Sequence, residues 1–241
     1  MQYKTKQEAL AHAKEDFPKE ACGLVIIHNG EEKYLKCNNL AENPEHNFAL
    51  DPECFQIAEE LGEIIEVFHS HPKSRPLPSD LDKACMEWTE LPWSIVNPET
   101  EEWHRCEPVG WKPPLVGRPY HWGVNDCYTL ARDWYKQHKI ILPEFKKERP
   151  KSRKAFILDP VLNKLINQMG FYEVKKDFKT IQKGDFLLMT QGKVLMGHCA
   201  VYVGDGRILH QCYNSLSSID TYDTELQQST VKMLRHYNWK V

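Results

Sequence analysis

The sequence predicts an α+β protein made of two domains in series. With 241 residues, 41% of them hydrophobic, the chain is long enough for two cores of ordinary domain size. A stretch rich in proline and glycine, residues 108–119, disfavours both helix and central strand. The formal charge changes sign at the same place. We therefore expect a first domain at 1–108, an extended and fairly stiff linker at 109–118 and a second domain at 119–241.

The two halves carry opposite charge. Residues 1–110 hold 10 Lys and Arg against 22 Asp and Glu, a net −12, whereas residues 111–241 hold 21 against 12, a net +9. The acidic half argues against nucleic acid as a partner, and the basic half fits a polyanion or an acidic protein. Ordinary solvated surfaces explain both charges equally well.

The N-terminus and the cysteines indicate the compartment. No apolar run approaches the roughly 18 residues of a membrane span, and the first residues lack a signal peptide pattern. We expect synthesis in the cytoplasm and no membrane insertion. The eight cysteines form no CxxC pair, which favours reduced thiols over a disulfide framework or a structural zinc knuckle.

The first domain is expected to follow the order α-β-β-α-β-α-β-β. Thr5 with Glu8 predicts a capping box for a helix that ends near Asp16. The remaining predicted elements are a hairpin of strands 22–28 and 33–37 around Asn29-Gly30, a helix opened by Asp51-Pro52 and closed by Gly62, a buried strand at 64–68 that ends at His69, a helix capped by Ser79 and Asp82 that ends near Thr89, and strands at 93–96 and 102–106.

Three nitrogen and oxygen ligands converge after the buried strand. His69 and His71 lie two residues apart on an extended segment, so their imidazoles point to the same side. Asp82, in the first turn of the following helix, can return a carboxylate to the same point. Three such ligands with a fourth position left for water are the open arrangement of catalytic zinc.

Two further residues complete this set. Glu20 precedes a strand and could accept a proton from a zinc-bound water, and Ser79 could hydrogen-bond a developing oxyanion. Each element is weak by itself, because a lone His-x-His is more often structural and Ser-x-x-Asp is usually only a helix cap. Their combination predicts a zinc hydrolase.

Residues 1–106 resemble the JAMM (MPN-plus) metalloprotease family. The family pattern is a Glu before the second strand, then His-x-His-Pro, then Ser-x-x-Asp with the Asp eleven residues after the second His, and each element is present. The resemblance implies Glu20 as general base, His69, His71 and Asp82 as ligands of one Zn²⁺, and Ser79 as transition-state stabiliser. Family members cleave isopeptide or peptide bonds, and some relatives keep the fold only as a scaffold.

In the second domain a cysteine begins a predicted helix. Cys127 precedes an apolar stripe at helical spacing, formed by Leu130, Ala131, Trp134 and Tyr135. A helix N-terminus favours the thiolate. Downstream the sequence predicts a turn and strand at 183–189 and two strands at 197–203 and 207–212 around Gly204-Asp205-Gly206.

The last two predicted strands carry two histidines. With a three-residue loop, Ala200 faces His210 and His198 lies diagonally from it on the same sheet face. His198 can then activate Cys127, and His210 can orient the His198 ring. Taken alone, each is more often a buried core residue. Cys199 and Cys212 are rival nucleophiles, but both fall in predicted strand interiors and not at a helix N-terminus.

Residues 112–241 resemble the NlpC-type cysteine peptidase family, which has a papain-like core. The matching motifs are Tyr120-His-Trp122-Gly123 before Asp126-Cys127, Lys183-Gly-Asp185, His198-x-Ala-Val-Tyr-Val-Gly, and His210 twelve residues after His198. The resemblance implies Cys127, His198 and His210 as the catalytic set and Tyr120 as a residue that positions the Cys and stabilises the oxyanion. Tyr128 stands where many members have Ser, which affects the site beside the nucleophile.

A JAMM-like domain followed by an NlpC-type domain resembles the tail tip assembly proteins of lambda-like bacteriophages. That resemblance implies cleavage of host peptidoglycan stem peptides during entry, typically between D-glutamate and diaminopimelate, and contacts with other tail tip proteins. It places the chain in the host cytoplasm on synthesis and at the virion tail tip, acting in the host periplasm. A maturation protease for tail proteins and a non-enzymatic assembly factor are the alternatives.

Overall fold

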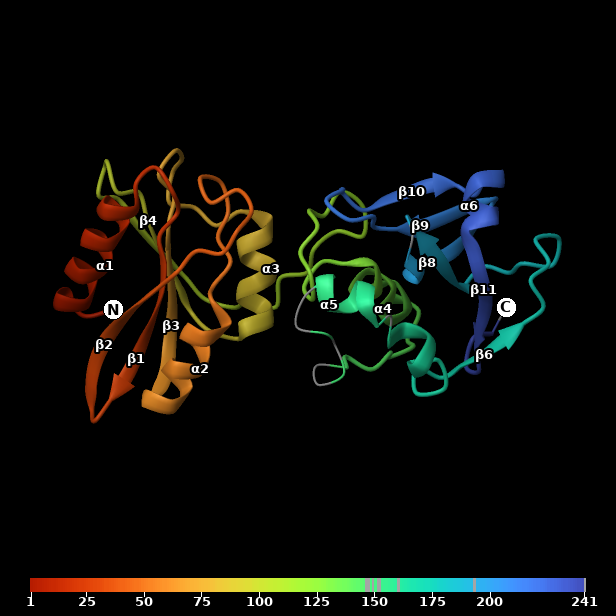
Figure 1. Ribbon diagram of the computed structural model, residues 1–241, viewed down its shortest axis with the longest axis horizontal. Coiled ribbons are helices and arrows are strands. Elements are labelled where there is room, and N and C mark those ends of the chain that lie inside the picture. Colours follow the sequence, from red (N-terminus) through yellow and green to blue (C-terminus); the bar gives the residue numbers. More distant parts are fainter. Residues whose placement is uncertain (146–147, 149, 151–152, 160, 193, 241) are drawn as a thin grey trace. The chain divides into compact units, whose positions relative to one another are not determined.

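We describe the protein in a computed structural model of the full chain. The structure describes residues 1–145, 148, 150, 153–159, 161–192 and 194–240. The chain divides into two compact units, Met1–Lys112 and Pro113–Val241 (Figure 1). Each unit combines helices with one β-sheet, so the predicted α+β class is confirmed. Within the described part of the chain, every helix falls short of the length and apolar character that crossing a membrane requires.

The first unit is built on a five-stranded sheet with the order β2-β1-β3-β4-β5, in which only β3 and β4 run parallel. Asn29 and Gly30 both have positive φ, as the tight turn of the predicted hairpin requires. This two-residue turn lets pairing start at Glu31, two residues earlier than predicted. The strands are β1 (Cys22–His28), β2 (Glu31–Cys37), β3 (Glu63–Ser70), β4 (Trp93–Val96) and β5 (Trp103–Cys106).

Helices cover both faces of this sheet. Helix α1 (Tyr3–Asp16) lies on one face, and α2 (Pro52–Leu61) and α3 (Asp80–Thr89) lie on the other (Figure 1). Successive residues of β3 point to opposite faces, so Phe68 packs among α1 residues whereas Val67 packs with residues of α2 and α3. The sheet is therefore the middle layer of an α/β/α sandwich.

The predicted caps of α2 and α3 are confirmed, and that of α1 is wrong. Asp51 caps α2 by accepting from the Glu53 N–H at 3.0 Å, and α3 has the full Ser79 capping box. Helix α1 begins at Tyr3, so Thr5 lies inside it and is buried. The terminal ammonium of Met1, just before this helix, lies 3.0 Å from the buried Glu66 carboxylate.

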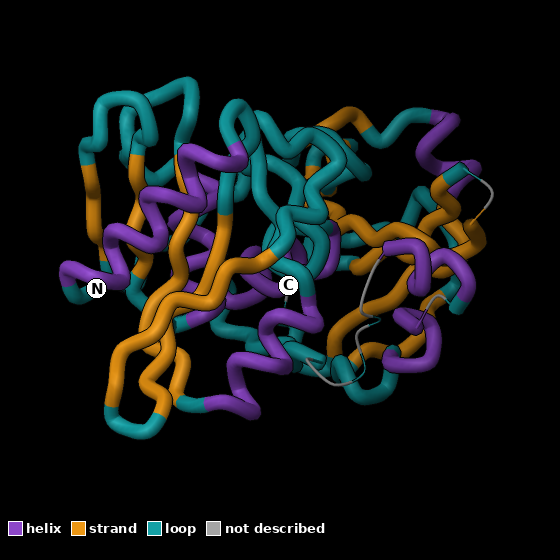
Figure 2. The backbone as a smooth tube through the Cα atoms, turned by 60° about the vertical axis from the view of Figure 1, so that its left-hand side comes forward, coloured by secondary structure: helices purple, strands orange, loops and turns teal. Residues whose placement is uncertain are grey.

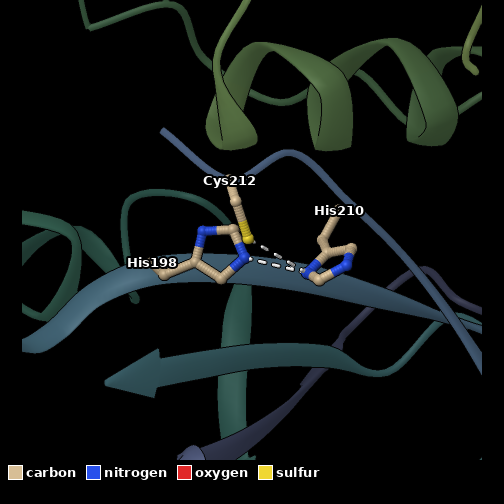
Figure 3. A group of neighbouring side chains, drawn as sticks. All are labelled: His198, His210 and Cys212. Carbon is tan, nitrogen blue, oxygen red and sulfur yellow. Dashed lines mark hydrogen bonds between the residues drawn. The ribbon is translucent and has the colours of Figure 1, made fainter. Parts of the chain in front are cut away.

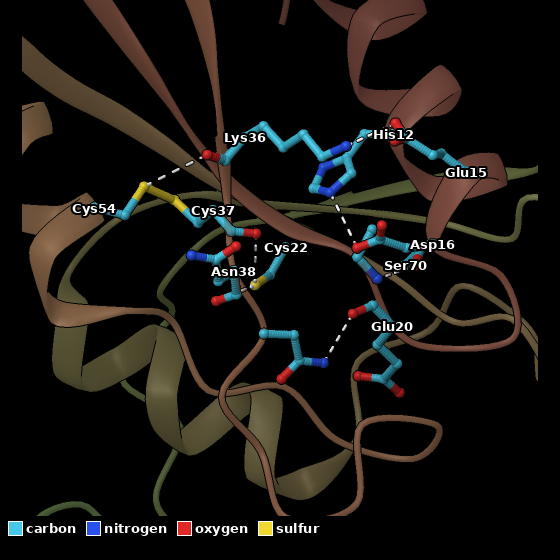
Figure 4. A network of polar contacts seen from close by, with 12 residues as sticks. His12, Glu15, Asp16, Glu20, Cys22, Lys36, Cys37, Asn38, Cys54 and Ser70 are labelled. Atoms are coloured by element: carbon cyan, nitrogen blue, oxygen red, sulfur yellow. Dashed lines mark hydrogen bonds and ion pairs between the residues drawn. A yellow bond between two sulfur atoms is a disulfide. The ribbon is translucent and has the colours of Figure 1, made fainter.

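One pair of cysteines departs from the expectation of reduced thiols. Cys37, at the end of β2, forms a disulfide with Cys54 of α2 (Figure 4). The two cysteines are 17 positions apart, and the chain between them folds α2 back against the sheet, an approach that sequence spacing could not show. The other six cysteines form no disulfide.

The stretch predicted as a linker is divided between the units. The backbone N–H groups of Val109, Gly110 and Trp111 all donate to the Glu87 carboxylate of α3, at 2.8 to 3.0 Å. This carboxylate fastens the first part of the stretch to the first unit. The proline- and glycine-rich pattern could not predict this contact, because the partner, Glu87, is a helix residue more than 20 positions earlier.

The second unit has a six-stranded antiparallel sheet with the order β10-β9-β8-β7-β11-β6 (Figure 2, orange). Strand β9 ends at His210 and not at Cys212 as predicted. Beyond it, the Gln211 side chain bonds the Arg118 and Ser215 carbonyls, which carries the chain out of the ladder. The strands are β6 (Phe171–Val174), β7 (Phe186–Gln191), β8 (Val194–Gly204), β9 (Arg207–His210), β10 (Ser218–Thr221) and β11 (Thr230–His236).

Helix α4 (Cys127–Gln137) packs on one face of this sheet. Its predicted stripe of Leu130, Ala131, Trp134 and Tyr135 is buried in one cluster with Phe186 and Leu188 of β7. Two short segments, α5 (Arg153–Leu158) and the 3-10 turn η1 (Val161–Leu165), join the same cluster. Helix α6 (Thr224–Ser229) contributes Leu226 to the opposite face.

Arg118 ties the start of the second unit to its core, and this predicts where the chain can be cut. It is 1% exposed, its guanidinium donates to Asp133 of α4 at 2.8 Å, and its carbonyl accepts from the buried side chain of Gln211. A fragment that begins at Trp111 should fold cooperatively alone. A fragment that begins at Pro119 leaves buried polar groups unpaired, which lowers the free energy of unfolding by about 1–3 kcal/mol for each group.

Urea denaturation of the two fragments checks this expectation. The longer fragment should show one cooperative transition, and the shorter one a clearly lower midpoint. Equal midpoints would mean that Arg118 contributes no net stability. A longer fragment that is molten, while the full chain folds, would show that the boundary is wrong.

Candidate active sites

The structure brings the three predicted zinc ligands together in the first unit. His69 is the penultimate residue of strand β3, His71 follows that strand, and Asp82 is in the first turn of α3. The Nε2 atoms of the two histidines are 3.0 Å apart. Asp82 approaches both rings, with Oδ1 3.6 Å from His69 Nε2 and Oδ2 3.5 Å from His71 Nε2.

These separations fit one zinc ion. Ligands bound tetrahedrally at about 2.0–2.1 Å lie roughly 3.3 Å from one another, and the three distances here scatter around that value. His71 Nδ1 lies 3.1 Å from the Arg75 carbonyl, which can only accept, so Nδ1 carries the proton and Nε2 offers its lone pair. The donor set therefore fits a catalytic zinc site before any metal binds.

A helix cap aims the Asp82 carboxylate. The Ser79 N–H donates to Asp82 Oδ2 at 2.7 Å, and Ser79 Oγ accepts from the Asp82 N–H at 3.1 Å. Burial alone would raise the pKa of Asp82, but His69 and His71 hold that pKa well below its ordinary value. The ligand is therefore a carboxylate. Because Ser79 Oγ acts as acceptor in the cap, its hydroxyl hydrogen is available to a substrate.

Glu20 lies beside the two histidines. One carboxylate oxygen of Glu20 lies within 4.8 Å of ligand atoms of His69 and His71. Its backbone is fixed by a bond from its N–H to the Pro44 carbonyl at 2.7 Å and by the Asn39 amide, which donates to its carbonyl at 2.8 Å (Figure 4). Burial raises the pKa of Glu20 to about 7, close to the ideal value for a general base at neutral pH.

The second unit places Cys127 at the first residue of α4. Asp126 caps the helix by accepting from the N–H groups of Tyr128 and Thr129 at 3.1 and 2.9 Å, so the thiol sits at the positive end of the helix dipole. A hydrogen bond with Cys199 and interactions with His198 lower the pKa of Cys127 to about 5, although burial acts in the opposite direction. Cys199 is thus a partner of the nucleophile, a role that its strand position did not indicate.

The side chains of His198, His210 and Asp220 form a hydrogen-bonded relay. His198 Nε2 lies 3.2 Å from His210 Nδ1 (Figure 3), and His210 Nε2 lies 2.8 Å from Asp220 Oδ2. Because the carboxylate accepts, a neutral His210 is protonated at Nε2, and its Nδ1 accepts the proton of His198 Nε2. His198 Nδ1 is then unprotonated and available to accept a proton. The Ala200–His210 pairing agrees with the predicted register.

Asp220 is the member of this relay that sequence analysis missed. It lies in β10, where Ser218 pairs with His210, and the hydrogen bond with His210 lowers its pKa. Burial disfavours charge on His210, yet the bonds with Cys212 and Asp220 raise the pKa of that ring. Only the pairing of β10 with β9 could have revealed Asp220.

Cys127 lines an open pocket, whose empty space including open solvent is about 580 Å³. Tyr120 and Gln211 line it, and burial together with the charge of Cys127 raises the pKa of Tyr120, so its phenol remains a hydrogen-bond donor. Tyr128, which departs from the family pattern, is buried and donates to the Pro143 carbonyl at 2.7 Å. Among the described lining residues most of the others are apolar, and Arg153 is a cation whose guanidinium carbon lies 4.0 Å from the Tyr213 ring centroid.

The two rival cysteines occupy different positions. Cys199 is fully buried in β8, and Cys212 lies beyond the end of β9, half-buried, with its sulfur 4.0 Å from His210 Nδ1. Placing Cys212 in a strand interior was therefore wrong, because the ladder ends before it.

Alkylation as a function of pH should single out Cys127. A thiol becomes reactive above its pKa, so labelling of Cys127 by iodoacetamide should rise through about pH 5 and then level off. Burial raises the pKa of Cys106 to about 11, so this control thiol should stay nearly unlabelled at pH 7. Peptide mass spectrometry gives both rates. A Cys127 rate that still climbs through pH 8 to 9 would show an ordinary thiol.

Each unit matches one family model. The model of prokaryotic homologs of the JAB domain, the domain of the JAMM family, matches residues 3–107, and that of the NlpC/P60 family matches residues 117–235. The fold and the two clusters thus define a protein that joins a JAB domain to an NlpC/P60 peptidase-type domain.

Comparison with curated proteins gives the particular family. The chain is 31% identical over 237 residues to tail tip assembly protein K of Escherichia phage N15, covering 98% of this chain and 96% of the relative. It is 36% identical over 193 residues to the protein of that name from Escherichia phage lambda, covering 79% and 91%. The chain belongs to the tail tip assembly protein K family. The chain is also 28% identical over 103 residues to a gamma-D-glutamyl-L-lysine dipeptidyl-peptidase of Bacillus cereus, covering 40% of this chain and 25% of that protein.

Proposed function

We propose that the second unit is a cysteine endopeptidase that cleaves stem peptides of host peptidoglycan during entry, in a protein that also takes part in building the tail tip. The observation that carries the proposal is the alignment of Cys127 at a helix N-terminus with the relay of His198, His210 and Asp220. We place the protein in the host cytoplasm on synthesis and at the virion tail tip during entry, where it would act in the periplasm.

The geometry supports nucleophilic catalysis through an acyl-enzyme. The Cys127 thiolate attacks the scissile carbonyl carbon, and the proton held by His198 passes to the leaving amine as the C–N bond breaks. Water then attacks the thioester, His198 takes its proton, and Cys127 is released. Tyr120 is positioned to donate a hydrogen bond to the oxyanion in both steps.

Two observations favour a stem peptide as substrate. The B. cereus relative is named for a bond that involves gamma-linked D-glutamate, and a gamma link leaves the α-carboxylate of that residue free. Arg153 presents a guanidinium in the pocket of Cys127, and guanidinium groups suit carboxylates. We propose a bond next to such a carboxylate, such as that between D-glutamate and diaminopimelate.

Muropeptide analysis tests this proposal. Purified wall is digested with wild-type protein and with Cys127→Ala, and the fragments are identified by mass spectrometry. New free amines on stem peptides in the wild-type digest alone would support it. If the wall stays intact while a tail tip protein is cleaved, the site is that of a maturation protease. If Cys127→Ala assembles normal, infectious tails, the chemistry is dispensable and the protein is an assembly factor.

We propose further that the first unit is a zinc peptidase or isopeptidase. Its support is the convergence of His69, His71 and Asp82 at separations that suit one Zn²⁺. Zinc in this position supplies a Lewis acid and an acidified water. Glu20 is placed to accept a proton from water and return it to the leaving group, and the Ser79 hydroxyl to stabilise the oxyanion.

A further inference from the structure

A second group of metal-ligand atoms lies in the peptidase unit. His198 of β8, His210 at the end of β9 and Cys212 two residues later bring three ligand atoms within 4.8 Å of one another (Figure 3). His210 Nδ1 lies 3.2 Å from His198 Nε2 and 4.0 Å from Cys212 Sγ. Two imidazole nitrogens and one thiolate sulfur form a donor set that zinc prefers over magnesium or calcium.

The spacing is close to what zinc needs. From bond lengths of about 2.0–2.1 Å to nitrogen and 2.3 Å to sulfur, tetrahedral ligands lie roughly 3.3 Å apart for two nitrogens and 3.6 Å for nitrogen and sulfur. The nitrogen pair already has this separation. The sulfur lies 4.0 Å from His210 Nδ1 and within 4.8 Å of the His198 ligand atom, so it must move inward, and Cys212 lies on a loop beyond the strand end, where such a shift is easy.

The surroundings orient the central ligand. The Asp220 carboxylate accepts from His210 Nε2 at 2.8 Å and so leaves the lone pair of His210 Nδ1 facing the cluster. A carboxylate behind a ligating histidine is the usual second shell of a zinc site, since it fixes the tautomer and increases the basicity of the ring. His198 and His210 are buried and Cys212 is half-buried, so an ion would enter past the sulfur.

We propose that His198, His210 and Cys212 form a second, inhibitory zinc site that switches off the peptidase. The inhibitory role rests on the proposed peptidase function. Metal binding rests only on the three ligand residues. Binding releases the thiol proton of Cys212 to solvent and moves the proton of His198 from Nε2 to Nδ1, without electron transfer. With Nε2 on the metal and Nδ1 protonated, His198 has no lone pair for the proton of the water that hydrolyses the thioester, so it cannot act as general base.

The same atoms therefore serve two exclusive states. In the active state His198 Nε2 donates its proton to His210 Nδ1, and in the inhibited state both nitrogens bind the ion. Peptidase activity then depends on the free zinc concentration, and removal of zinc restores it without any change in covalent structure.

Cobalt binding tests the site directly. Full-length protein carrying His69→Ala and His71→Ala, which lacks the ligands proposed for the first unit, is titrated with Co²⁺. A cobalt–thiolate charge-transfer band in the near ultraviolet requires a cysteine ligand, and the first cluster contains none. We expect the band in this protein and in its Cys127→Ala and Cys106→Ser derivatives, and its loss in Cys212→Ser and Cys212→Ala.

Inhibition gives the second readout. Zinc should inhibit stem-peptide cleavage reversibly, and Cys212→Ser should keep basal cleavage and need at least about tenfold more zinc for half-inhibition. Absence of the band, or a band that survives both Cys212 substitutions, would overturn the site. Loss of the band in Cys212→Ser together with unchanged zinc inhibition would overturn the inhibitory role.

If the protein cleaves no stem peptide, the cobalt band still shows whether the metal site exists. Failure of the metal site and failure of the proposed peptidase function can therefore be told apart.

Discussion

Cys127→Ala should abolish cleavage of stem peptides, with a loss in kcat of roughly 10⁶-fold, the size seen when a nucleophile acting as part of a catalytic unit is removed. The physical reason is that no other described thiol combines a helix N-terminus with a neighbouring His198. Cys199 is fully buried and Cys212 faces His210 from a loop. Kinetics on a synthetic stem peptide, at zinc concentrations kept low by a chelator, measure the loss.

Substitution of the relay residues should reduce kcat by graded amounts. His198→Ala should cost about as much as Cys127→Ala because both members belong to one unit, whereas His210→Ala and Asp220→Asn, which act by orienting a ring, should each cost roughly 10- to 100-fold. Cys106 is a half-buried thiol of the first unit, so the Cys106→Ser control should leave kcat unchanged. If a chelator stops cleavage and Cys127→Ala does not, the zinc cluster of the first unit is the site that acts on the wall.

Sequence predicted best what is local along the chain. Ser79 and Asp82 of the α3 cap are three residues apart, and His69 and His71 are two residues apart. The structure brings Asp82, eleven residues after His71, to both histidines. The hairpin of β1 and β2 could likewise be predicted from two neighbouring residues, Asn29 and Gly30, which both have positive φ.

What sequence could not predict depends on pairing between distant segments. Asp220 joins the relay only because β10 adds to the sheet beside β9, and the disulfide of Cys37 with Cys54 depends on how α2 packs. Strands β6 and β11 pair across nearly 60 residues and were not assigned. Thr5 does not cap the helix because α1 begins two residues before it, at Tyr3, and buries its side chain.

Zinc binding by the first unit is the second large effect that we expect. In a Cys212→Ser background, which lacks the thiolate of the other proposed site, the protein should bind about one zinc per chain, and His69→Ala should reduce this to near zero. The reason is that two nitrogens and one carboxylate already sit at zinc spacing, and the loss of one leaves too few ligands. Elemental analysis after dialysis measures the content. His104→Ala, a histidine of the same sheet outside the cluster, is the matched control and should keep the zinc.

Glu20→Gln separates metal binding from chemistry at this site. The amide keeps the size of the side chain but cannot accept a proton, so zinc content should stay near one while metal-dependent hydrolysis falls by about 10²- to 10⁴-fold. Saturating zinc should also raise the melting temperature of both wild type and Glu20→Gln, because an ion at 1,000 times its Kd adds about 4 kcal/mol to the free energy of unfolding. If Glu20→Gln loses the metal as well, Glu20 is a ligand and not the base. If His69→Ala keeps the metal, the cluster has been assigned to the wrong residues.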